Sequence, residues 1–448
     1  HVIFDQAADG TYSGNLTGSG TLTKTGGGKL TLAGQNAHSG VTYVQQGILP
    51  VNTVTMVGNL INDALVIWDQ LTEGEYAGDI SGAGVVHKTG GGTLRLTGAN
   101  SYSGGTSVLE GTLVGDASSL QGNITNHGTI DFLQNDSGTY AGVMSGSGQL
   151  VKSGGGTLTL TGANSYAGGT TVASGTLVGD SISLQGSISN SATLVFNQTN
   201  HGTFNGMLEG SGTVQKLGAG TLTFVGLHNF NGSTHVDAGA LRLNAHLGGT
   251  LHVAATAQLS GVGLVEGNAT IAGVHAPGDE VGVQSFAGNL TYADGASIQL
   301  QFLSLAPLAF AGNDFAPSAA FDQILVGGDL VFAGATSVSL SFNAAGSSID
   351  WFDPVWDADQ SWAVFEVEGA ITDFHQLTLA SVTWLDANGH SLASLRDDAE
   401  FSLSIESGAV LLNYHAAAIP EPSTYAVLVG ILVLAFASLR RRRSVAAA

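Results

Sequence analysis

The chain contains no cysteine, and basic residues are scarce, and each shortage excludes a class of protein. Without cysteine among its 448 residues, the chain forms neither disulfides nor thiolate metal sites. Lysine and arginine number 12 against 34 acidic residues, and four of the 12 form one run, Arg440 to Arg443. With a formal net charge of −22, the body lacks the basic surface that neutralises phosphates, so nucleic acid is excluded as a partner.

What the chain has instead is a period of 64 residues that returns without insertion or deletion. Each copy opens on an aromatic residue and carries a lysine followed by a glycine-rich turn. The aromatic residues are Tyr12, Tyr76, Tyr140 and Phe204, and the lysines are Lys24, Lys88, Lys152 and Lys216. A single unit of this length cannot bury its own apolar face, so the period predicts stacked copies, which is a solenoid.

The fine pattern within each copy predicts strands. The stretch from Gly20 to Gly34 alternates leucine and lysine with threonine, which is a period of two, and its β-branched residues favour sheet. Glycine, 66 residues in all, falls between these runs where tight turns form. We therefore predict an all-β fold, a right-handed parallel β-helix. With about 20 residues in a rung, one copy makes about three rungs and stacks equivalent lysines about 14 Å apart.

The repeats resemble a known family. The segments from Lys88 to Leu113 and from Lys152 to Leu177 share the order strand, triple glycine, strand, GANxYxGGTxV and GTL. This order is similar to that of the autotransporter-associated β-strand repeat of bacterial surface proteins, and looser copies run from Lys24 to Leu49 and from Lys216 to Leu241. The resemblance implies an exported β-helix and implies no reaction.

The C-terminal tail has three parts in a fixed order. Pro420, Glu421 and Pro422 precede an apolar run from Ala426 to Leu439, and Arg440, Arg441, Arg442 and Arg443 follow it. This order resembles the PEP-CTERM sorting signal, which implies recognition by an exosortase-type membrane protease. The apolar run, as a short helix over 426–439, would hold the chain transiently in the inner membrane with the arginines in the cytoplasm. The alternative is a plain C-terminal membrane anchor.

Composition divides the chain into four parts. We expect a β-helix of 64-residue repeats over 1–245, less regular rungs over 246–345, a tryptophan-rich β cap over 346–415 and the sorting tail over 416–448. Residues 401–416 read as a final hairpin in that cap. The first residues align one period upstream of "LVIWDQ", so the chain begins inside a rung, and we expect a signal peptide and a cap before it.

No catalytic group and no cofactor site stand out in the sequence. His127 and His201 both occur in "NHG" but in different registers, which is typical of turn residues. The best metal candidate gathers Asp350, Asp353, Asp357 and Asp359, whose carboxylates would suit Ca²⁺, but their spacing does not match a calcium loop. A solvated acidic loop is the preferred interpretation.

Two functional classes remain open. The favoured one is a non-enzymatic, adhesin-like protein of the cell surface or extracellular matrix, associated with exopolysaccharide or other surface glycans. The alternative is a carbohydrate-active β-helix enzyme, a polysaccharide lyase or hydrolase, which an acidic cluster in one groove would favour. Recurrent aromatic positions either line a sugar-binding surface or pin the rungs from inside; they are His38, Tyr102, Tyr166 and Phe230.

Overall fold

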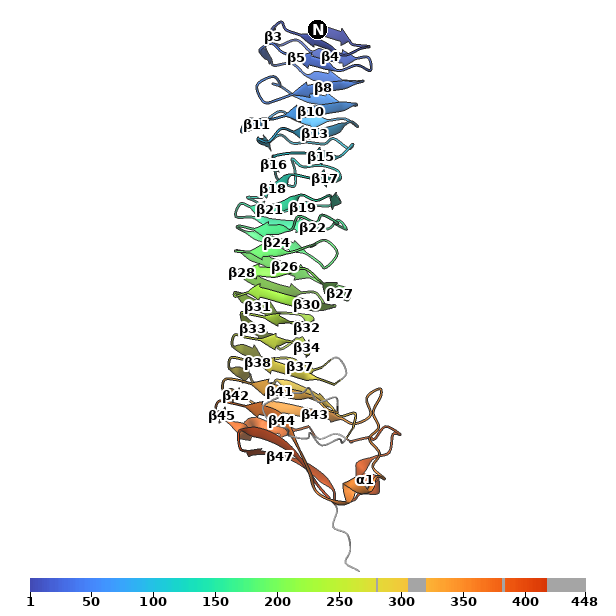
Figure 1. Ribbon diagram of the computed structural model, residues 1–448, viewed down its shortest axis with the longest axis vertical. Helices are drawn as coiled ribbons and strands as arrows, with labels where there is room; N and C mark the ends of the chain where they lie inside the picture. Colours follow the sequence, from blue (N-terminus) through green and yellow to red (C-terminus); the bar gives the residue numbers. More distant parts are fainter. Residues whose placement is uncertain (279–280, 305–319, 381–382, 417–448) are drawn as a thin grey trace, which may run out of the picture.

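Each short strand pairs in parallel with a strand about one rung later in the chain. Val86 in β13 (Val85–Thr89) pairs with Thr106 in β15 (Thr106–Val108), and Thr106 pairs with Ile124 in β17 (Ile124–Asn126). The computed structural model, which describes residues 1–278, 281–304, 320–380 and 383–416, is accordingly one long rod of stacked rungs (Figure 1). The predicted all-β solenoid with parallel strands is confirmed.

The strands of the described residues form long ladders along the rod. A five-stranded sheet consists of β1 (Val2–Asp5), β4 (Leu22–Thr25), β7 (Thr42–Val44), β9 (Leu60–Asn62) and β12 (Ile80–Ser81). A six-stranded sheet joins β8 (Ile48–Val51), β10 (Leu65–Asp69), β13, β15, β17 and β20 (Met144–Ser145). Two pairs lie beside them at the N-terminal end, β2 (Gly10–Tyr12) with β5 (Leu30–Leu32) and β3 (Leu16–Gly18) with β6 (Asn36–His38).

Two larger sheets continue to the C-terminal end. The 11-stranded sheet contains β19 (Gly138–Tyr140), β22 (Thr157–Leu160), β24 (Thr176–Gly179), β26 (Thr193–Asn197), β29 (Thr213–Leu217), β31 (Ser233–Val236), β33 (Thr250–Val253), β36 (Ala269–Ile271), β39 (Leu290–Tyr292), β42 (Leu330–Phe332) and β45 (Ile371–Thr372). The 22-stranded sheet contains β11 (Gly74–Tyr76), β14 (Thr93–Leu96), β16 (Thr112–Gly115), β18 (Thr129–Leu133), β21 (Gln149–Ser153), β23 (Thr170–Val172), β25 (Ile188–Asn190), β27 (Gly202–Phe204), β28 (Leu208–Gly210), β30 (Thr221–Phe230), β32 (Gly239–Leu247), β34 (Ala257–Gly261), β35 (Leu264–Val265), β37 (Val274–Pro277), β38 (Val283–Phe286), β40 (Ser297–Gln301), β41 (Gln323–Val326), β43 (Thr336–Ser341), β44 (Gln360–Val367), β46 (Leu377–Leu379), β47 (Glu400–Glu406) and β48 (Ala409–His415).

Successive repeats do not stack directly above one another, so the expected single column of lysines is wrong. Lys88 lies in the six-stranded sheet, Lys152 in the 22-stranded sheet and Lys216 in the 11-stranded sheet. The cause is the length of a rung, because the register advances by only 17 to 20 residues at each step. Three rungs therefore use less than one 64-residue repeat, and the remainder carries each copy to a different face of the rod.

The core follows from the period of two within each strand. In β14, Leu94 and Leu96 are buried, whereas Thr93 and Arg95 are not. The same alternation in the next repeat buries Leu158 and Leu160 of β22. Inward leucine, valine and isoleucine thus form one continuous core along the described rod, and threonine dominates the outward positions of these repeats.

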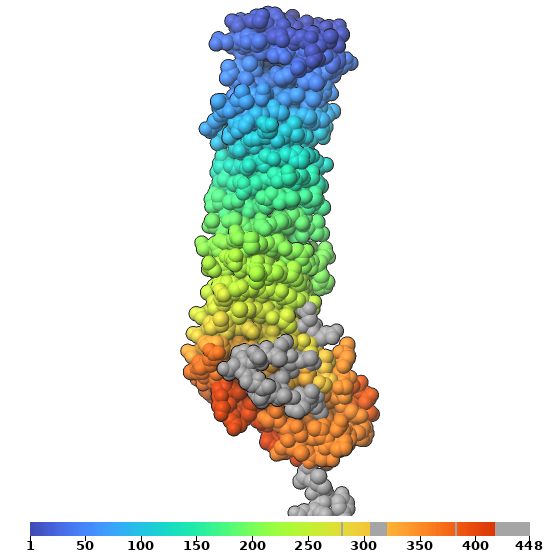
Figure 2. All heavy atoms as spheres, in the orientation of Figure 1, coloured from blue at the N-terminus to red at the C-terminus, as the bar shows by residue number. Residues whose placement is uncertain are grey.

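The C-terminal end closes with antiparallel strands. β48 pairs antiparallel with both β44 and β47, so the predicted final hairpin is present as β47 and β48. Figure 2 shows that the rod is widest here. Trp351 and Trp356 are buried with ring centroids 4.7 Å apart, and Trp356 packs against Tyr414 at 4.8 Å. The short helices of the described residues are η1 (Pro354–Asp357), η2 (Phe374–Gln376) and α1 (Leu392–Leu395).

The predicted sorting signal lies outside the described residues. Pro420, Glu421, Pro422, the apolar helix over 426–439 and Arg440 to Arg443 all follow Ala416, where the description ends. Among the residues that the structure does describe, no helix has the length and apolar character needed to cross a membrane. The sorting signal and the transient membrane anchor therefore stay predictions.

Candidate interaction surfaces

Each 64-residue repeat buries its lysine inside a cage of backbone carbonyls. The Nζ of Lys88 donates to the carbonyls of Thr89 at 2.8 Å, Gly90 at 2.6 Å and Glu110 at 3.2 Å. In each of the other three repeats, the lysine donates to the three equivalent carbonyls of its own repeat. These lysines are Lys24, Lys152 and Lys216. These lysines close the glycine turns from inside, so they offer no cationic surface to a ligand.

The local sequence explains why the lysine turns inward. Lys88 occupies an inward position of β13, directly after Trp68 in the ladder, so its methylene stem lies in the core. Gly90 has a φ of 74°, which lets the turn bend its carbonyls back toward the ammonium group. Burial lowers the pKa of all four lysines, and that of Lys216 to about 8. Three carbonyl dipoles contact the ammonium group directly, and the nearby carboxylates of Asp69 and Glu110 oppose the lowering of the pKa of Lys88.

The recurrent aromatic residues are internal, so they do not line a sugar-binding surface. Tyr102 and Tyr166 are 2% and 3% exposed. The hydroxyl of Tyr166 lies 2.8 Å from that of Thr170, and His38 Nε2 keeps an equivalent contact of 2.9 Å with Thr42. Phe230 has no such group. The interpretation that these residues pin the rungs from inside is confirmed, although they do not form one column.

A set of buried asparagines escaped the sequence analysis although it has the same period. The side-chain amide of Asn126 donates to the carbonyl of Gln149 at 2.9 Å, and its Oδ1 accepts from the amide of Gly128 at 3.1 Å. Asn62 and Asn190 do the same in the neighbouring repeats. The signal was available in the 64-residue spacing, but asparagine at the end of a short strand is typical of a turn.

The two histidines of "NHG" hold turns, as predicted. His127 is exposed and its Nδ1 lies 3.1 Å from the hydroxyl of Ser147. His201 is exposed too, and its Nδ1 accepts from the amide of Thr221 at 3.2 Å. Each histidine therefore bonds to the next rung, and the structure does not bring the two together.

The aspartates of the loop over 350–359 do not converge on one point. Asp353 caps η1 by accepting from the amide of Val355 at 2.9 Å, and Asp359 accepts from the amide of Ala416 at 2.9 Å. Asp357 forms an ion pair with Arg396 at 2.7 Å.

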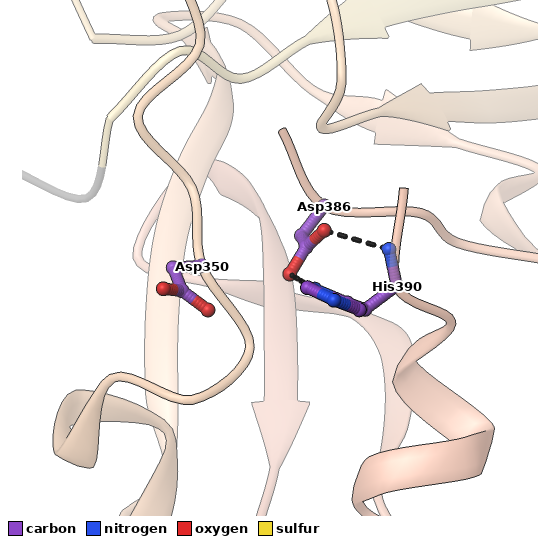
Figure 3. A group of neighbouring side chains, drawn as sticks. All are labelled: Asp350, Asp386 and His390. Carbon is purple, nitrogen blue, oxygen red and sulfur yellow. Dashed lines mark hydrogen bonds and ion pairs between the residues drawn. The ribbon is translucent and has the colours of Figure 1, made fainter. Parts of the chain in front are cut away.

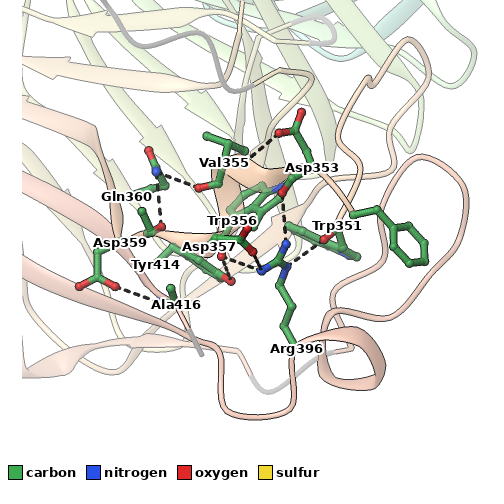
Figure 4. A network of polar contacts seen from close by, with 12 residues as sticks. Trp351, Asp353, Val355, Trp356, Asp357, Asp359, Gln360, Arg396, Tyr414 and Ala416 are labelled. Carbon is green, nitrogen blue, oxygen red and sulfur yellow. Dashed lines mark hydrogen bonds and ion pairs between the residues drawn. The ribbon is translucent and has the colours of Figure 1, made fainter. Parts of the chain in front are cut away.

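The side chain of Arg396 also binds main-chain carbonyls of the same loop (Figure 4). Its guanidinium also donates to the carbonyls of Trp351 at 2.8 Å and Trp356 at 2.9 Å. The loop is thus organised by an arginine and by local caps, and three of its four carboxylates are exposed.

Asp350 lies close to two residues that the sequence analysis did not select, Asp386 and His390. Ligand atoms of Asp350, Asp386 and His390 lie within 4.8 Å of one another (Figure 3). Asp386 is buried and accepts from the amides of Trp351, Asn388 and His390 and from His390 Nδ1. Burial alone would raise the pKa of Asp386, but these hydrogen bonds hold it below its ordinary value. Four donors occupy the carboxylate, so its role is to fix the turn rather than to bind a metal.

One groove of about 630 Å³ lies where the rod meets the C-terminal hairpin. Its apolar lining includes Leu264, Leu325 and Leu411. Three glutamates also line it, Glu366, Glu368 and Glu406. Sequence reasoning missed this groove, because alternating leucines outside the strict period read as core.

The comparisons with known proteins agree with the repeats. Four segments match the passenger-associated-transport-repeat family, residues 22–51, 86–114, 150–178 and 214–243. Each contains one caged lysine and its glycine turn, so the predicted resemblance to an autotransporter-associated repeat is confirmed.

Two curated proteins are similar to this chain over about half its length. It is 31% identical over 278 residues to the adhesin BmaC autotransporter of Brucella suis biovar 1 (strain 1330), covering 54% of the chain and 8% of that protein. It is 32% identical over 240 residues to the uncharacterized lipoprotein YdeK of Escherichia coli (strain K12), covering 49% of the chain and 17% of that protein. The chain thus spans a small part of the length of these relatives.

Proposed function

We propose that this chain is the rigid stalk of an exported, adhesin-like protein that acts outside the cell without catalysing a reaction. The observation that carries the proposal is the four repeat segments within one uninterrupted rod, similar in sequence to part of an autotransporter adhesin. A stack of rungs holds its outer positions at fixed spacing, and several weak contacts at fixed spacing gain avidity together. The partners we propose are exopolysaccharide or other surface glycans.

We propose further that the tail directs export through an exosortase-type membrane protease. Its support is the sequence alone, in the order of Pro420 to Pro422, the apolar run and the four arginines. In this proposal the run over 426–439 spends a transient period in the inner membrane, and the mature protein lacks Arg440 to Arg443. Intact-mass measurement of surface material tests it, and mature protein that still carries the four arginines would leave the plain anchor.

Surface labelling tests the stalk proposal. An epitope is inserted after Gly155, an exposed turn position with open space around it, in the full-length protein in its native cells. We expect an antibody to label intact cells, and beads coated with the protein to bind the exopolysaccharide of the same cells. Labelling only after permeabilisation, or beads that bind no better than uncoated ones, would contradict the proposal.

One observation favours the alternative of a carbohydrate-active enzyme, namely the three glutamates of the groove, Glu366, Glu368 and Glu406. Paired carboxylates are the usual acid and base of glycoside hydrolysis. The rest of the lining is largely aliphatic, which suits sugar hydroxyls poorly. Depolymerisation of a polysaccharide that is lost in both Glu366→Gln and Glu406→Gln would favour the enzyme over the stalk.

A further inference from the structure

The groove is formed by a line of outward positions, two of which are leucine. By register, Leu264 in β35 is followed by Ser285 in β38, Leu325 in β41, Glu366 in β44 and Ala409 in β48. In the strict repeats the outward positions of β14 and β22 are threonine and arginine. Outward leucine is not needed for the core here, so its presence indicates a contact surface.

The dimensions of the groove suit an extended chain. Four register steps separate Leu264 from Ala409, which at about 4.8 Å each make about 19 Å. An extended polypeptide covers that length with about six residues. The volume of about 630 Å³ lies in the range of ordinary ligand sites. A short peptide segment therefore fits better than a compact small molecule.

Charge selects among such segments. Glu366, Glu368 and Glu406 are the charged residues among the described residues that line the groove, and no lysine, arginine or histidine accompanies them there. Glu366 lies within the line of outward positions, whereas Glu406 belongs to the exposed tip of the β47–β48 hairpin. Carboxylates beside apolar surface favour an aliphatic segment that also carries positive charge.

We propose that this groove is a docking site for an extended segment of a partner protein in which aliphatic side chains alternate with lysine or arginine. The aliphatic side chains contact Leu264, Leu325 and Leu411. The cationic side chains face Glu366 and Glu406. This inference rests on the groove alone and does not depend on the proposed surface location.

Fluorescence anisotropy with the full chain tests it. The probe is a fluorescein-labelled peptide of ten residues in which leucine and arginine alternate. Two comparison peptides replace either every leucine by serine or every arginine by glutamate. We expect the leucine–arginine peptide to bind, and both comparison peptides to bind at least about tenfold more weakly, because each lacks one of the two contacts.

Matched variants locate the site. Leu325→Arg places a positive charge on the groove floor, and Glu366→Gln with Glu406→Gln removes two of the three negative charges of the groove, so each should weaken binding by about tenfold. The controls change an exposed leucine and an exposed acid far along the rod, Leu71→Arg and Asp136→Asn, and should leave affinity within about twofold. Circular dichroism confirms that each variant is folded.

Hydrogen exchange gives an independent readout. Bound peptide should slow exchange at the amides of the hairpin tip, residues 406–409, and should leave the N-terminal rungs unchanged. No binding, equal binding of the serine–arginine peptide, or equal loss in the two controls would overturn the proposal. Self-association of the free chain that Leu325→Arg abolishes would also overturn it, because a second copy would then be the occupant.

Discussion

The hydroxyl of Thr234 has no hydrogen-bond partner, because Phe230 occupies the position that holds tyrosine in the two preceding repeats. There, Tyr102 bonds Thr106 and Tyr166 bonds Thr170, each at 2.8 Å. The fourth repeat thus has the threonine without its tyrosine partner. Thr234 and Thr170 can therefore be compared as an unpaired and a paired hydroxyl at the same place in the repeat.

Substitution by valine should have opposite effects at the two threonines. Thr234→Val removes an unpaired buried hydroxyl and should raise the free energy of unfolding by about 1 kcal/mol. Thr170→Val removes one of the two hydrogen-bond partners of the Tyr166 hydroxyl, leaving the backbone of Gln185, and should lower the free energy of unfolding by about 1 kcal/mol. Urea unfolding followed by circular dichroism measures both, and a change of the same sign at the two sites would contradict the explanation.

Removal of a caged lysine should weaken its repeat. Lys152→Met keeps the apolar stem but leaves the carbonyls of Ser153, Gly154 and Ser174 without this donor. We expect the free energy of unfolding to fall by roughly 2 to 4 kcal/mol. The control is Lys29→Met, because the side chain of Lys29 is 44% exposed and faces Asp9 at 3.7 Å, a surface pair that contributes little to stability. Equal stability of the two variants would contradict a structural role for the cage.

The positions within a glycine turn should differ sharply in tolerance. A Cβ on Gly155 would meet nothing within 4 Å, whereas one on Gly156 would lie 2.2 Å from the carbonyl oxygen of Asp136. Gly155→Ala should therefore be neutral, within about 0.5 kcal/mol. Gly156→Ala should destabilise the rod by more than about 2 kcal/mol, because backbone of the neighbouring rung must move. Thermal unfolding distinguishes them, and a destabilising Gly155→Ala would argue against this packing.

Acid should destabilise the rod through a buried histidine. His275 lies 2.6 Å from the hydroxyl of Tyr292 and 2.7 Å from Oε1 of Gln284, and burial lowers its pKa to about 4. An unfolded chain, with an ordinary pKa of about 6.5, binds a proton first, so stability falls as pH drops from 6.5 to 4. The expected loss from this group is about 3 kcal/mol.

The comparison with His275→Gln isolates that contribution. The difference in unfolding free energy between parent and variant should shift in favour of the variant by about 3 kcal/mol between pH 6.5 and pH 4. A difference that stays constant over this interval would show that His275 does not titrate as the buried site implies.

The strands that repeat every 64 residues could be predicted from the sequence, and the contacts between distant residues in the parts that do not repeat could not. Leu94 and Leu158 recur in register with alternating threonine, so their strands and their burial were predictable. The shift of Lys152 to a different sheet from Lys88 was not, because it depends on the 17 to 20 residues of each rung, which a period of 64 does not reveal. Asp386 and His390 approach Asp350 in the aperiodic C-terminal part, where no spacing marks a contact between distant residues.

The shift of successive repeats from face to face also determines which sides of the rod carry a recurrent side chain. An outward side chain at one place in three successive repeats lies on three different faces, as the sheets of Lys88, Lys152 and Lys216 show. A molecule that contacts such a side chain could therefore approach the rod from several sides. Two rods lying side by side, in contrast, could not bring all their copies of that side chain into one interface, so dense lateral packing through the repeats is disfavoured.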